Sequence, residues 1–346
     1  MISFENDYAE GAHPAVLQRL IDTNLIQQPG YGNDCWCDSA KEKIRLACDA
    51  PEADIHFIVG GTQTNAVVIG TMLAPYEGII AAETGHINVH EAGAIEYTGH
   101  KVLPIPQHEG KILADELETY IARFYADGSH EHMVFPGMVY ISHPTEYGTL
   151  YTREELTAIS QVCRSYDIPL FLDGARLGYG LMSPGTDVDL PFLAEVCDVF
   201  YIGGTKVGAL FGEAVVISNA TIAEDFRYLM KQHGGMLAKG WLLGLQYEAL
   251  FEDDLYIKIS KQADLMADEI REMFASLGYE LLVDGVTNQI FPVLPDTLLE
   301  KLQHDFTFTE QQRVDASNRA VRFCTSWATE EKAVRALCDA VINLSK

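Results

Sequence analysis

The chain has 346 residues, of which 48% are hydrophobic, and its formal net charge at pH 7 is −26. This length can bury a sizeable core, and we expect one large domain with a smaller second domain. The acidic excess argues against binding to nucleic acid or to an anionic membrane, because both need a basic protein face, and no apolar run reaches the roughly 20 residues of a membrane span.

The N-terminal residues 1–14 are mostly polar and predict an extended arm. They contain neither the basic region nor the apolar core of a signal peptide, so we expect a cytoplasmic protein. A helix is predicted for residues 14–24, with Pro14 in its first turn. Turns rich in Gly and Asn follow at residues 28–34, and a second helix is expected at 39–48.

Seven cysteines are scattered along the chain, and Cys35 and Cys37 form the only close pair. A zinc site of the usual kind needs a second pair or histidines at a fixed spacing. Neither accompanies Cys35 and Cys37, so we expect no metal there.

A double glycine between a predicted strand and a predicted helix indicates an anion site. The strand spans residues 55–59 and is followed by Gly60-Gly61-Thr62 and an apolar helix that runs to residue 73. Backbone N–H groups at such a helix start, together with the helix dipole, favour a phosphate group. An ordinary turn with a Thr cap is the alternative. No complete dinucleotide or Walker motif is present, so a single phosphate is the expected ligand.

Two histidines follow the next predicted strand, at residues 79–82. His86 and His90 are four residues apart, and Glu91 comes directly after the second. On a helix the two imidazoles would share one face, which is the spacing of a two-histidine metal site. A planar imidazole after a strand end can also stack on a cofactor ring, and we favour this interpretation for His86.

Two further predicted strands carry ionisable residues at their carboxyl ends: one ends in an aspartate, and the other is followed by a lysine. Residues 170–173 are Leu-Phe-Leu-Asp173, and the strand at 199–202 is followed by Gly-Gly-Thr205-Lys206. Ligands of open α/β sheets bind beyond the carboxyl ends of the strands, so Asp173 and Lys206 are predicted to face one crevice. Pyridoxal phosphate (PLP) suits this pair, because it forms a Schiff base with lysine and needs an acidic partner at its ring nitrogen. Taken alone, Asp173 is better explained as a helix N-cap and Lys206 as a surface-loop residue, and only the two together favour a site.

Alternating strands and helices predict an α/β fold with a doubly wound, mostly parallel, seven-stranded sheet and helices on both faces. We expect an arm (1–14), a large PLP-binding domain (15–250) and a small α+β domain (251–346). The predicted strands of the large domain are 55–59, 79–82, 101–105, 138–142, 170–173, 199–202 and 213–217, with helices at 113–124, 153–165, 188–197, 222–231 and 236–251. Later strands are predicted at 280–283, 289–293 and 320–325, and later helices at 255–277, 296–302 and 329–344.

The chain resembles low-specificity L-threonine aldolases, which belong to the β-eliminating lyase group of fold-type I PLP enzymes. The resemblance spans nearly the whole chain, and the Asp-Gly-Ala-Arg and Thr-Lys blocks are its most specific parts. The matching blocks are Asn6-Asp7, residues 31–34, 61–65, 85–93 and 142–149, Phe171 to Arg176, Gly204 to Ala209 and Val321 to Ser326.

The resemblance implies a role for each matching residue. Lys206 would carry PLP, Asp173 would bind the ring nitrogen, and His86 would stack on the ring. Arg176, beside the cofactor, and Arg322 would bind the substrate carboxylate through their planar guanidinium groups. The other implied residues are Gly61, Thr62 and Thr205 at the phosphate, Lys239 at the phosphate of a neighbouring subunit, Asn6 at the substrate, and Tyr31 at the substrate from the partner chain.

The implied reaction cleaves L-threonine, L-allo-threonine and related β-hydroxy-α-amino acids to glycine and an aldehyde. His86 is the expected base for the hydroxyl proton, directly or through water, and His132 is a second candidate. The resemblance also implies a homo-oligomer, expected to be a tetramer. The alternatives are another fold-type I enzyme (a β-eliminating lyase, an amino-acid racemase or an aminotransferase), a non-catalytic binding protein, and a metal-dependent hydrolase built on His86 and His90.

Overall fold

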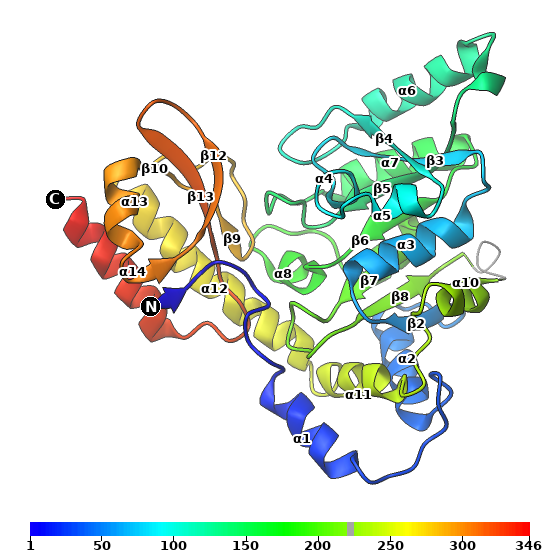
Figure 1. Cartoon of the computed structure of the whole chain (residues 1–346), viewed down its shortest axis with the longest axis horizontal. Helices are drawn as coiled ribbons and strands as arrows, with labels where there is room; N and C mark the ends of the chain where they lie inside the picture. The colour runs from blue at the N-terminus through cyan, green and yellow to red at the C-terminus, as the bar shows by residue number, and fades with distance from the viewer. Residues whose placement is uncertain (220–224) are drawn as a thin grey trace.

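A seven-stranded sheet forms the centre of the larger of two lobes in the computed structural model, which describes residues 1–219 and 225–346 (Figure 1). Its strands are β2 (Asp54–Ile58), β3 (Glu77–Ala82), β4 (Lys101–Ile105), β5 (Phe135–Ser142), β6 (Leu170–Asp173), β7 (Val199–Gly203) and β8 (Glu213–Ile217). The spatial order is β2-β8-β7-β6-β5-β3-β4. Only β8 runs antiparallel to its neighbours, which confirms the predicted mostly parallel sheet.

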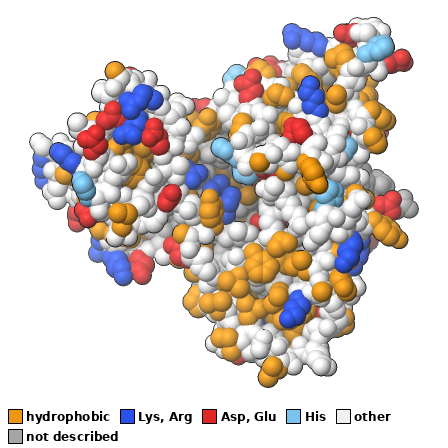
Figure 2. All heavy atoms as spheres, in the orientation of Figure 1, with side chains coloured by type: hydrophobic (Ala, Val, Ile, Leu, Met, Phe, Trp, Pro, Cys, Tyr) orange, Lys and Arg blue, Asp and Glu red, His pale blue; other side chains and the backbone are white. Residues whose placement is uncertain are grey.

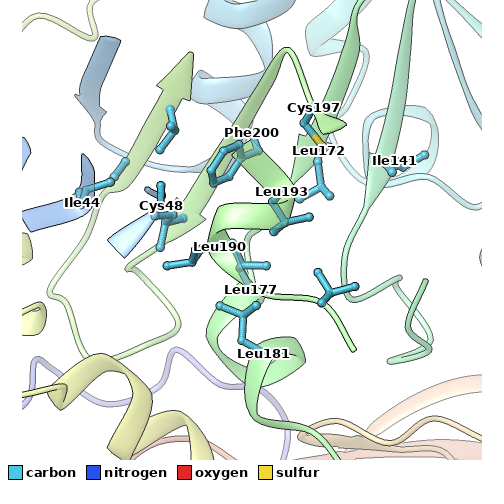
Figure 3. Close-up of a cluster of buried hydrophobic side chains, with 14 of the residues drawn as sticks. Ile44, Cys48, Ile141, Leu172, Leu177, Leu181, Leu190, Leu193, Cys197 and Phe200 are labelled. Carbon is cyan, nitrogen blue, oxygen red and sulfur yellow. The ribbon is translucent and has the colours of Figure 1, made fainter. Parts of the chain in front are cut away.

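Successive residues of the central strands pack on opposite faces of this sheet, as the pleat requires. In β6, Leu170 and Leu172 join one buried cluster and Phe171 joins the other. Figure 3 shows part of the first cluster, where Leu172 and Phe200 of neighbouring strands meet leucines of the covering helices. Because both faces are buried, these strands are nearly continuous apolar runs, and the sequence pattern predicted them well.

Helices cover both faces of the sheet. Those that contribute to the first cluster are α1 (Pro14–Thr23), α2 (Cys35–Ala47), α6 (Ala114–Ala126), α7 (Arg153–Ser165), α8 (Leu177–Met182), α9 (Leu190–Val196), α11 (Trp241–Leu250) and the N-terminal part of α12 (Leu255–Ser276). The second cluster is covered by α3 (Gly61–Met72), α4 (His86–Val89), α5 (Ala94–Tyr97) and α10 (Phe226–Gln232). In the described part of the chain, no helix is both long and apolar enough to cross a membrane.

Several predicted helix boundaries differ from the structure. The helix predicted at 39–48 begins at Cys35, because Asp34 caps it by accepting a hydrogen bond from the Cys37 N–H at 2.9 Å. The helix predicted at 236–251 begins only at Trp241. The prediction at 222–231 falls partly on residues 220–224, which lie outside the described residues. The short helix α8, directly after the Asp-Gly-Ala-Arg block, was not predicted.

The smaller lobe is built on a four-stranded sheet against three helices. Its elements are α12 (Leu255–Ser276), β9 (Gln289–Ile290), β10 (Val293–Pro295), α13 (Asp296–Leu302), β11 (Phe306–Thr307), β12 (Thr309–Arg313), β13 (Asn318–Cys324) and α14 (Glu331–Leu344). Strand β13 pairs with β9, β10 and β12, and β11 pairs instead with β1 (Ile2–Ser3).

Two strand predictions in this lobe are wrong. The segment 280–283 forms only an isolated bridge between Leu281 and Pro292, and the strand predicted at 289–293 is divided into β9 and β10. Strand β12 was missed, because its sequence Thr-Glu-Gln-Gln-Arg is polar and largely exposed and therefore has no apolar alternation.

The N-terminal arm is extended, as predicted, but it is anchored in the smaller lobe. Strand β1 pairs in parallel with β11, and Phe4 is 1% exposed within the core of that lobe. The arm therefore precedes the large domain in the sequence and packs on the small one in space. The division of the chain after residues 14 and 250 stays a prediction.

Candidate active site

A cavity of about 350 Å³ lies at the carboxyl ends of the parallel strands. Figure 2 shows a hollow between the two lobes, with Lys and Arg side chains beside it. Asp173 ends β6, and Lys206 follows the adjacent parallel strand β7, so the predicted common crevice is present. The predicted site residues that line the cavity are Gly61, Thr62, His86, Asp173, Arg176, Thr205 and Lys206.

Asp173 is 4% exposed, and donors on several elements surround its carboxylate. Tyr140 donates to Oδ2 at 2.6 Å, Asn65 donates to the same oxygen at 3.3 Å, and Tyr201 donates to Oδ1. Burial, with the Asp173 charge beside them, raises the pKa of both tyrosine hydroxyls well above the usual range, so they stay neutral donors. These bonds orient a buried carboxylate that can hold a proton on a cationic ring nitrogen.

His86 begins α4 at the edge of the cavity. Its Nδ1 lies 2.7 Å from Oε1 of Glu91, which also accepts a hydrogen bond from Asn65 at 2.8 Å. A carboxylate only accepts hydrogen bonds, so Nδ1 carries the hydrogen and Nε2 is the basic atom. Burial lowers the pKa of His86, but the bond to Glu91 and the charge of Asp173 outweigh burial and raise the pKa above its ordinary value.

The amine of Lys206 lies among charged groups inside the cavity. Burial, and next the Arg176 charge, lower its pKa, which favours the neutral nucleophilic amine. Glu213, the first residue of β8, accepts a hydrogen bond from the Gly204 N–H at 3.1 Å. Burial raises the pKa of Glu213 to about 8, against the opposing effects of the Thr205 hydroxyl and the Lys206 charge.

The first turn of α3 borders the cavity and can hold an anion. Its N-cap residue Gly60 provides no side-chain cap, so the backbone N–H groups at the helix start are available to a ligand. A Cβ on Gly61 would lie 3.2 Å from the Tyr201 hydroxyl, which is tighter than ordinary contact. A glycine here thus lets the helix start approach the tyrosine that binds Asp173.

These groups fit PLP. A lysine amine, a buried carboxylate and an anion-binding helix start line one cavity, and they match the aldehyde, the ring nitrogen and the phosphate of that cofactor.

The two predicted carboxylate-binding arginines both contact the N-terminal arm. Arg176 donates from Nε and Nη2 to the carboxylate of Asp7, at 2.7 and 3.0 Å. Arg322 lies outside the cavity lining and donates to the Glu5 carbonyl at 3.0 Å and to Gln289 Oε1 at 3.2 Å.

Asn6 lies between these two contacts on the arm. Its side chain accepts a hydrogen bond from the N–H of Tyr8 at 3.0 Å, and Tyr8 lines the cavity. The structure thus places Asn6 beside the cavity, where it shapes the turn that carries Tyr8.

Tyr31 and Lys239 are brought together, but outside the cavity. The Tyr31 N–H donates to the Ala238 carbonyl at 3.3 Å, and Lys239 is exposed. Tyr31 has φ 64°, a left-handed conformation that is unusual for a bulky residue. It lines a separate hollow of about 720 Å³ with His56 and Arg227. That hollow is larger than the cavity, but its lysine, Lys231, is exposed and its carboxylate, Asp54, is only half-buried, whereas Asp173 is buried.

His132 is not close to His86 within this chain. It is exposed in the short 3₁₀ helix before β5, whereas Ser142, at the other end of β5, lines the cavity. An eight-residue strand spans roughly 25 Å. His90, in contrast, has its ring centroid 5.7 Å from that of His86, and no three His, Cys, Asp or Glu side chains of the described residues are grouped to hold a metal ion.

Sequence reasoning missed several groups around the site. Two features of the sequence could have indicated them. A tyrosine in a buried strand needs a hydrogen-bond partner for its hydroxyl, and a buried Asp or Glu side chain needs a hydrogen-bond donor. The missed residues are Asp7, Asn65, Tyr140, Tyr201, Glu213 and Glu146, which lines the cavity and accepts a hydrogen bond from the His86 N–H at 2.9 Å. Glu91 was noticed only as a neighbour of His90.

Comparisons with known proteins agree with this geometry. The model of the beta-eliminating lyase family matches residues 11–296. A low-specificity L-threonine aldolase of a Pseudomonas species is 29% identical over 343 residues, covering 96% of this chain and 95% of the relative. A solved structure of Leishmania major threonine aldolase is 41% identical over all of both chains, with a TM-score of 0.97. A Thermus thermophilus aspartate aminotransferase shares the fold alone, at 13% identity and TM-score 0.73 over 99% of this chain and 91% of that one.

Proposed function

The chain belongs to the beta-eliminating lyase family, and from this premise we propose that it is a PLP-dependent lyase that cleaves L-threonine to glycine and acetaldehyde. L-allo-threonine and related β-hydroxy-α-amino acids are the other expected substrates. The observation that carries the proposal is the cavity shared by Lys206, Asp173 and the α3 helix start, within a fold that matches a threonine aldolase over its full length.

The cofactor would be held by three groups of the cavity. Lys206 would bind it covalently, Asp173 would bond its ring nitrogen, and the first turn of α3 with Gly61 and Thr62 would bind its phosphate. Thr205 lines the same cavity and its hydroxyl is a further candidate for the phosphate. The chemistry that PLP supplies when bound is an electron sink for the electrons left at the substrate α-carbon.

Arg176 and Arg322 would bind the substrate carboxylate. A guanidinium pairs with a carboxylate through parallel N–H bonds, so two of them would fix the direction of the α-carbon bonds. A carboxylate fixed in this way would hold the α-carbon in one orientation, which would favour cleavage between Cα and Cβ over the other bonds of that carbon.

His86 would accept the proton of the β-hydroxyl at Nε2, directly or through one water. Glu91 supports this role, because its carboxylate holds the hydrogen on Nδ1 and stabilises the imidazolium that forms. The imidazolium would then pass this proton to the substrate α-carbon after the aldehyde has left, which completes glycine. Asp173 would stay in place to hold the proton on the ring nitrogen during the reaction, because Tyr140 and Tyr201 each donate a hydrogen bond to one of its carboxylate oxygens.

A homo-oligomer, expected to be a tetramer, would complete the site. Tyr31 and Lys239 lie together at the surface, where they can reach the cavity of a neighbouring copy. Figure 2 shows hydrophobic side chains gathered over the region of α1, α2 and α11. Ile21 is 70% exposed and Leu25 92%, a pattern typical of an interaction surface. Light scattering should report a multiple of 38.3 kDa. The expected cytoplasmic location belongs to this proposal as well.

The deciding experiment is an absorption spectrum of the purified protein with PLP, before and after addition of L-threonine, with glycine and acetaldehyde assayed in the same tube. A visible cofactor band and both products in equal amounts support the proposal. A band with pyruvate and ammonia, a keto acid or the D-enantiomer would instead identify another fold-type I enzyme. Lys206→Ala should lose the covalent cofactor band, and normal turnover in that variant would contradict the assignment of Lys206.

A further inference from the structure

The buried carboxylate of Asp7 joins three parts of the molecule. It lies on the arm, its side chain is 0% exposed, and it accepts two hydrogen bonds from Arg176 of the larger lobe. Asn288 of the smaller lobe donates to Oδ2 of the same carboxylate at 2.9 Å. The arm, which runs between the two lobes in Figure 1, is therefore tied to both of them at one residue.

The Asp7 contact fixes how Arg176 faces the cavity. Nε and one hydrogen of Nη2 are bonded to Asp7, so Nη1 and the second hydrogen of Nη2 remain for a ligand. Burial raises the pKa of Asp7, but the charges of Arg176 and Lys206 and two hydrogen bonds outweigh burial and bring the pKa to about 2. Asp7 therefore stays ionised in the range where enzymes work.

The same short segment also holds Arg322. The Glu5 carbonyl accepts a hydrogen bond from Nη2 of Arg322 at 3.0 Å, two residues before Asp7. The segment is anchored directly upstream, because the Phe4 N–H donates to the Thr307 carbonyl at 2.9 Å and the Phe4 carbonyl accepts from Cys324 at 2.8 Å. Two guanidinium groups from different lobes are thus set against one fixed stretch of backbone.

We propose that Asp7 is a positioning residue for recognition of the substrate carboxylate: it holds the Arg176 guanidinium so that the remaining donors of Arg176 face that carboxylate. This inference rests on the proposed function for the identity of the substrate. According to this inference, the N-terminal arm contributes to substrate binding through Arg176 and does not contribute to cofactor binding.

The test compares two amines that differ only in the carboxylate. Glycine and methylamine both react at the cofactor aldehyde, but only glycine offers a carboxylate to the arginines. Their dissociation constants are measured from the change in the visible band of the PLP-bound protein. In Asp7→Asn, whose amide presents N–H groups to a guanidinium, glycine should bind roughly tenfold or more weakly, while methylamine and PLP should bind as in the wild type.

Steady-state kinetics supply a second readout. Asp7→Asn should raise the KM for L-threonine with little change in kcat, because a lost carboxylate contact weakens ground state and transition state alike. Glu10→Gln is the matched control on the same arm. Glu10 is exposed and its carboxylate accepts a hydrogen bond from the Ser326 hydroxyl at 3.4 Å, longer than the bonds of Asp7, so its loss should change neither constant. Asp7→Glu keeps the negative charge and should recover part of the glycine affinity. This variant also provides a test if Asp7→Asn does not fold.

Equal binding changes for glycine and methylamine, or no change for either, would overturn the inference, because the contact would then be purely structural. Failure of the proposed function is recognised separately, as a wild-type protein that binds glycine in preference to methylamine yet forms no glycine and acetaldehyde from L-threonine.

Discussion

The Nδ1 atom of His86 lies 2.7 Å from Oε1 of Glu91, and the Glu91 side chain is completely buried. Between them lie only the rest of the short helix α4 and its C-cap residue His90. The left-handed residues Ala92 and Gly93, with φ of 52° and 73°, follow Glu91 directly. A neutral histidine held in this way offers Nε2 as its proton acceptor, which is the atom that the proposed retro-aldol cleavage requires.

The first prediction concerns the pH dependence of the reaction. The Glu91 hydrogen bond and charge help to raise the pKa of His86, and His86 must be neutral to accept a proton. Activity should therefore rise with pH through the pKa of His86. Glu91→Gln keeps a hydrogen-bond acceptor but removes the charge, so the acidic limb of kcat/KM should move to lower pH, with kcat reduced by roughly tenfold or more.

The control for that experiment is Glu96→Gln, an exposed acid on α5, which should leave the profile unchanged. If Glu91→Gln left the acidic limb in place, His86 would not be the group that titrates.

The second prediction concerns the donors around Asp173. Tyr140→Phe and Tyr201→Phe each remove one hydrogen bond to the carboxylate that would hold the cofactor ring. Each should weaken PLP binding by about 1 kcal/mol, which is roughly fivefold. Fluorescence titration of the cofactor-free protein measures this. Tyr151→Phe removes a buried hydroxyl that bonds the Ile112 N–H instead, so PLP affinity should be preserved; an equal loss there would point to a general packing effect.

The third prediction concerns Arg322. Arg322→Ala should mainly weaken substrate binding and raise the KM for L-threonine, by roughly tenfold to a hundredfold, because a charge-assisted pair with the carboxylate is lost. Arg319→Ala on the same strand is the comparison, since Arg319 pairs with Asp296 and Glu310 and not with the arm. Unchanged affinity in Arg322→Ala would remove this residue from the carboxylate site.

The fourth prediction concerns stability. Asp264 on α12 is 2% exposed, and neither carboxylate oxygen has a hydrogen-bond partner among the described residues. Burial, with the Asp268 charge nearby, raises its pKa from 3.8 to about 9. The folded protein therefore keeps this proton while the unfolded chain releases it above pH 4, so the free energy of unfolding falls as pH rises from about 4 towards 9.

The Asn side chain of Asp264→Asn does not ionise, so this fall in the free energy of unfolding with rising pH should be absent from the variant. The variant should gain in urea midpoint relative to the wild type at pH 8.5, and the gain should be smaller at pH 5. Asp339→Asn, at an exposed carboxylate of α14, should show no such pH-dependent difference. A gain of equal size at both pH values would mean that Asp264 does not carry its proton in the folded state.

The order of residues along the chain was enough to predict the central sheet and the residues at its strand ends. Strands β4, β6 and β8 lie at the predicted residues, because a strand buried on both faces is a short apolar run with sharp limits. Asp173 ends such a run and Lys206 closely follows another, so local order was sufficient to predict that these two share one crevice. The place of Gly61 and Thr205 in the same site came from the family resemblance.

The groups that surround those residues could not be predicted from the order of residues and became visible only in the folded chain. Asp7 pairs with Arg176 across 169 positions of the chain, and Asn288 reaches Asp7 across 281. Side-chain hydrogen bonds of this kind depend on how the lobes pack, and no periodicity in the sequence records such packing. Tyr31 and Lys239, which the resemblance assigned to the site of a neighbouring subunit, both lie outside the cavity of their own chain.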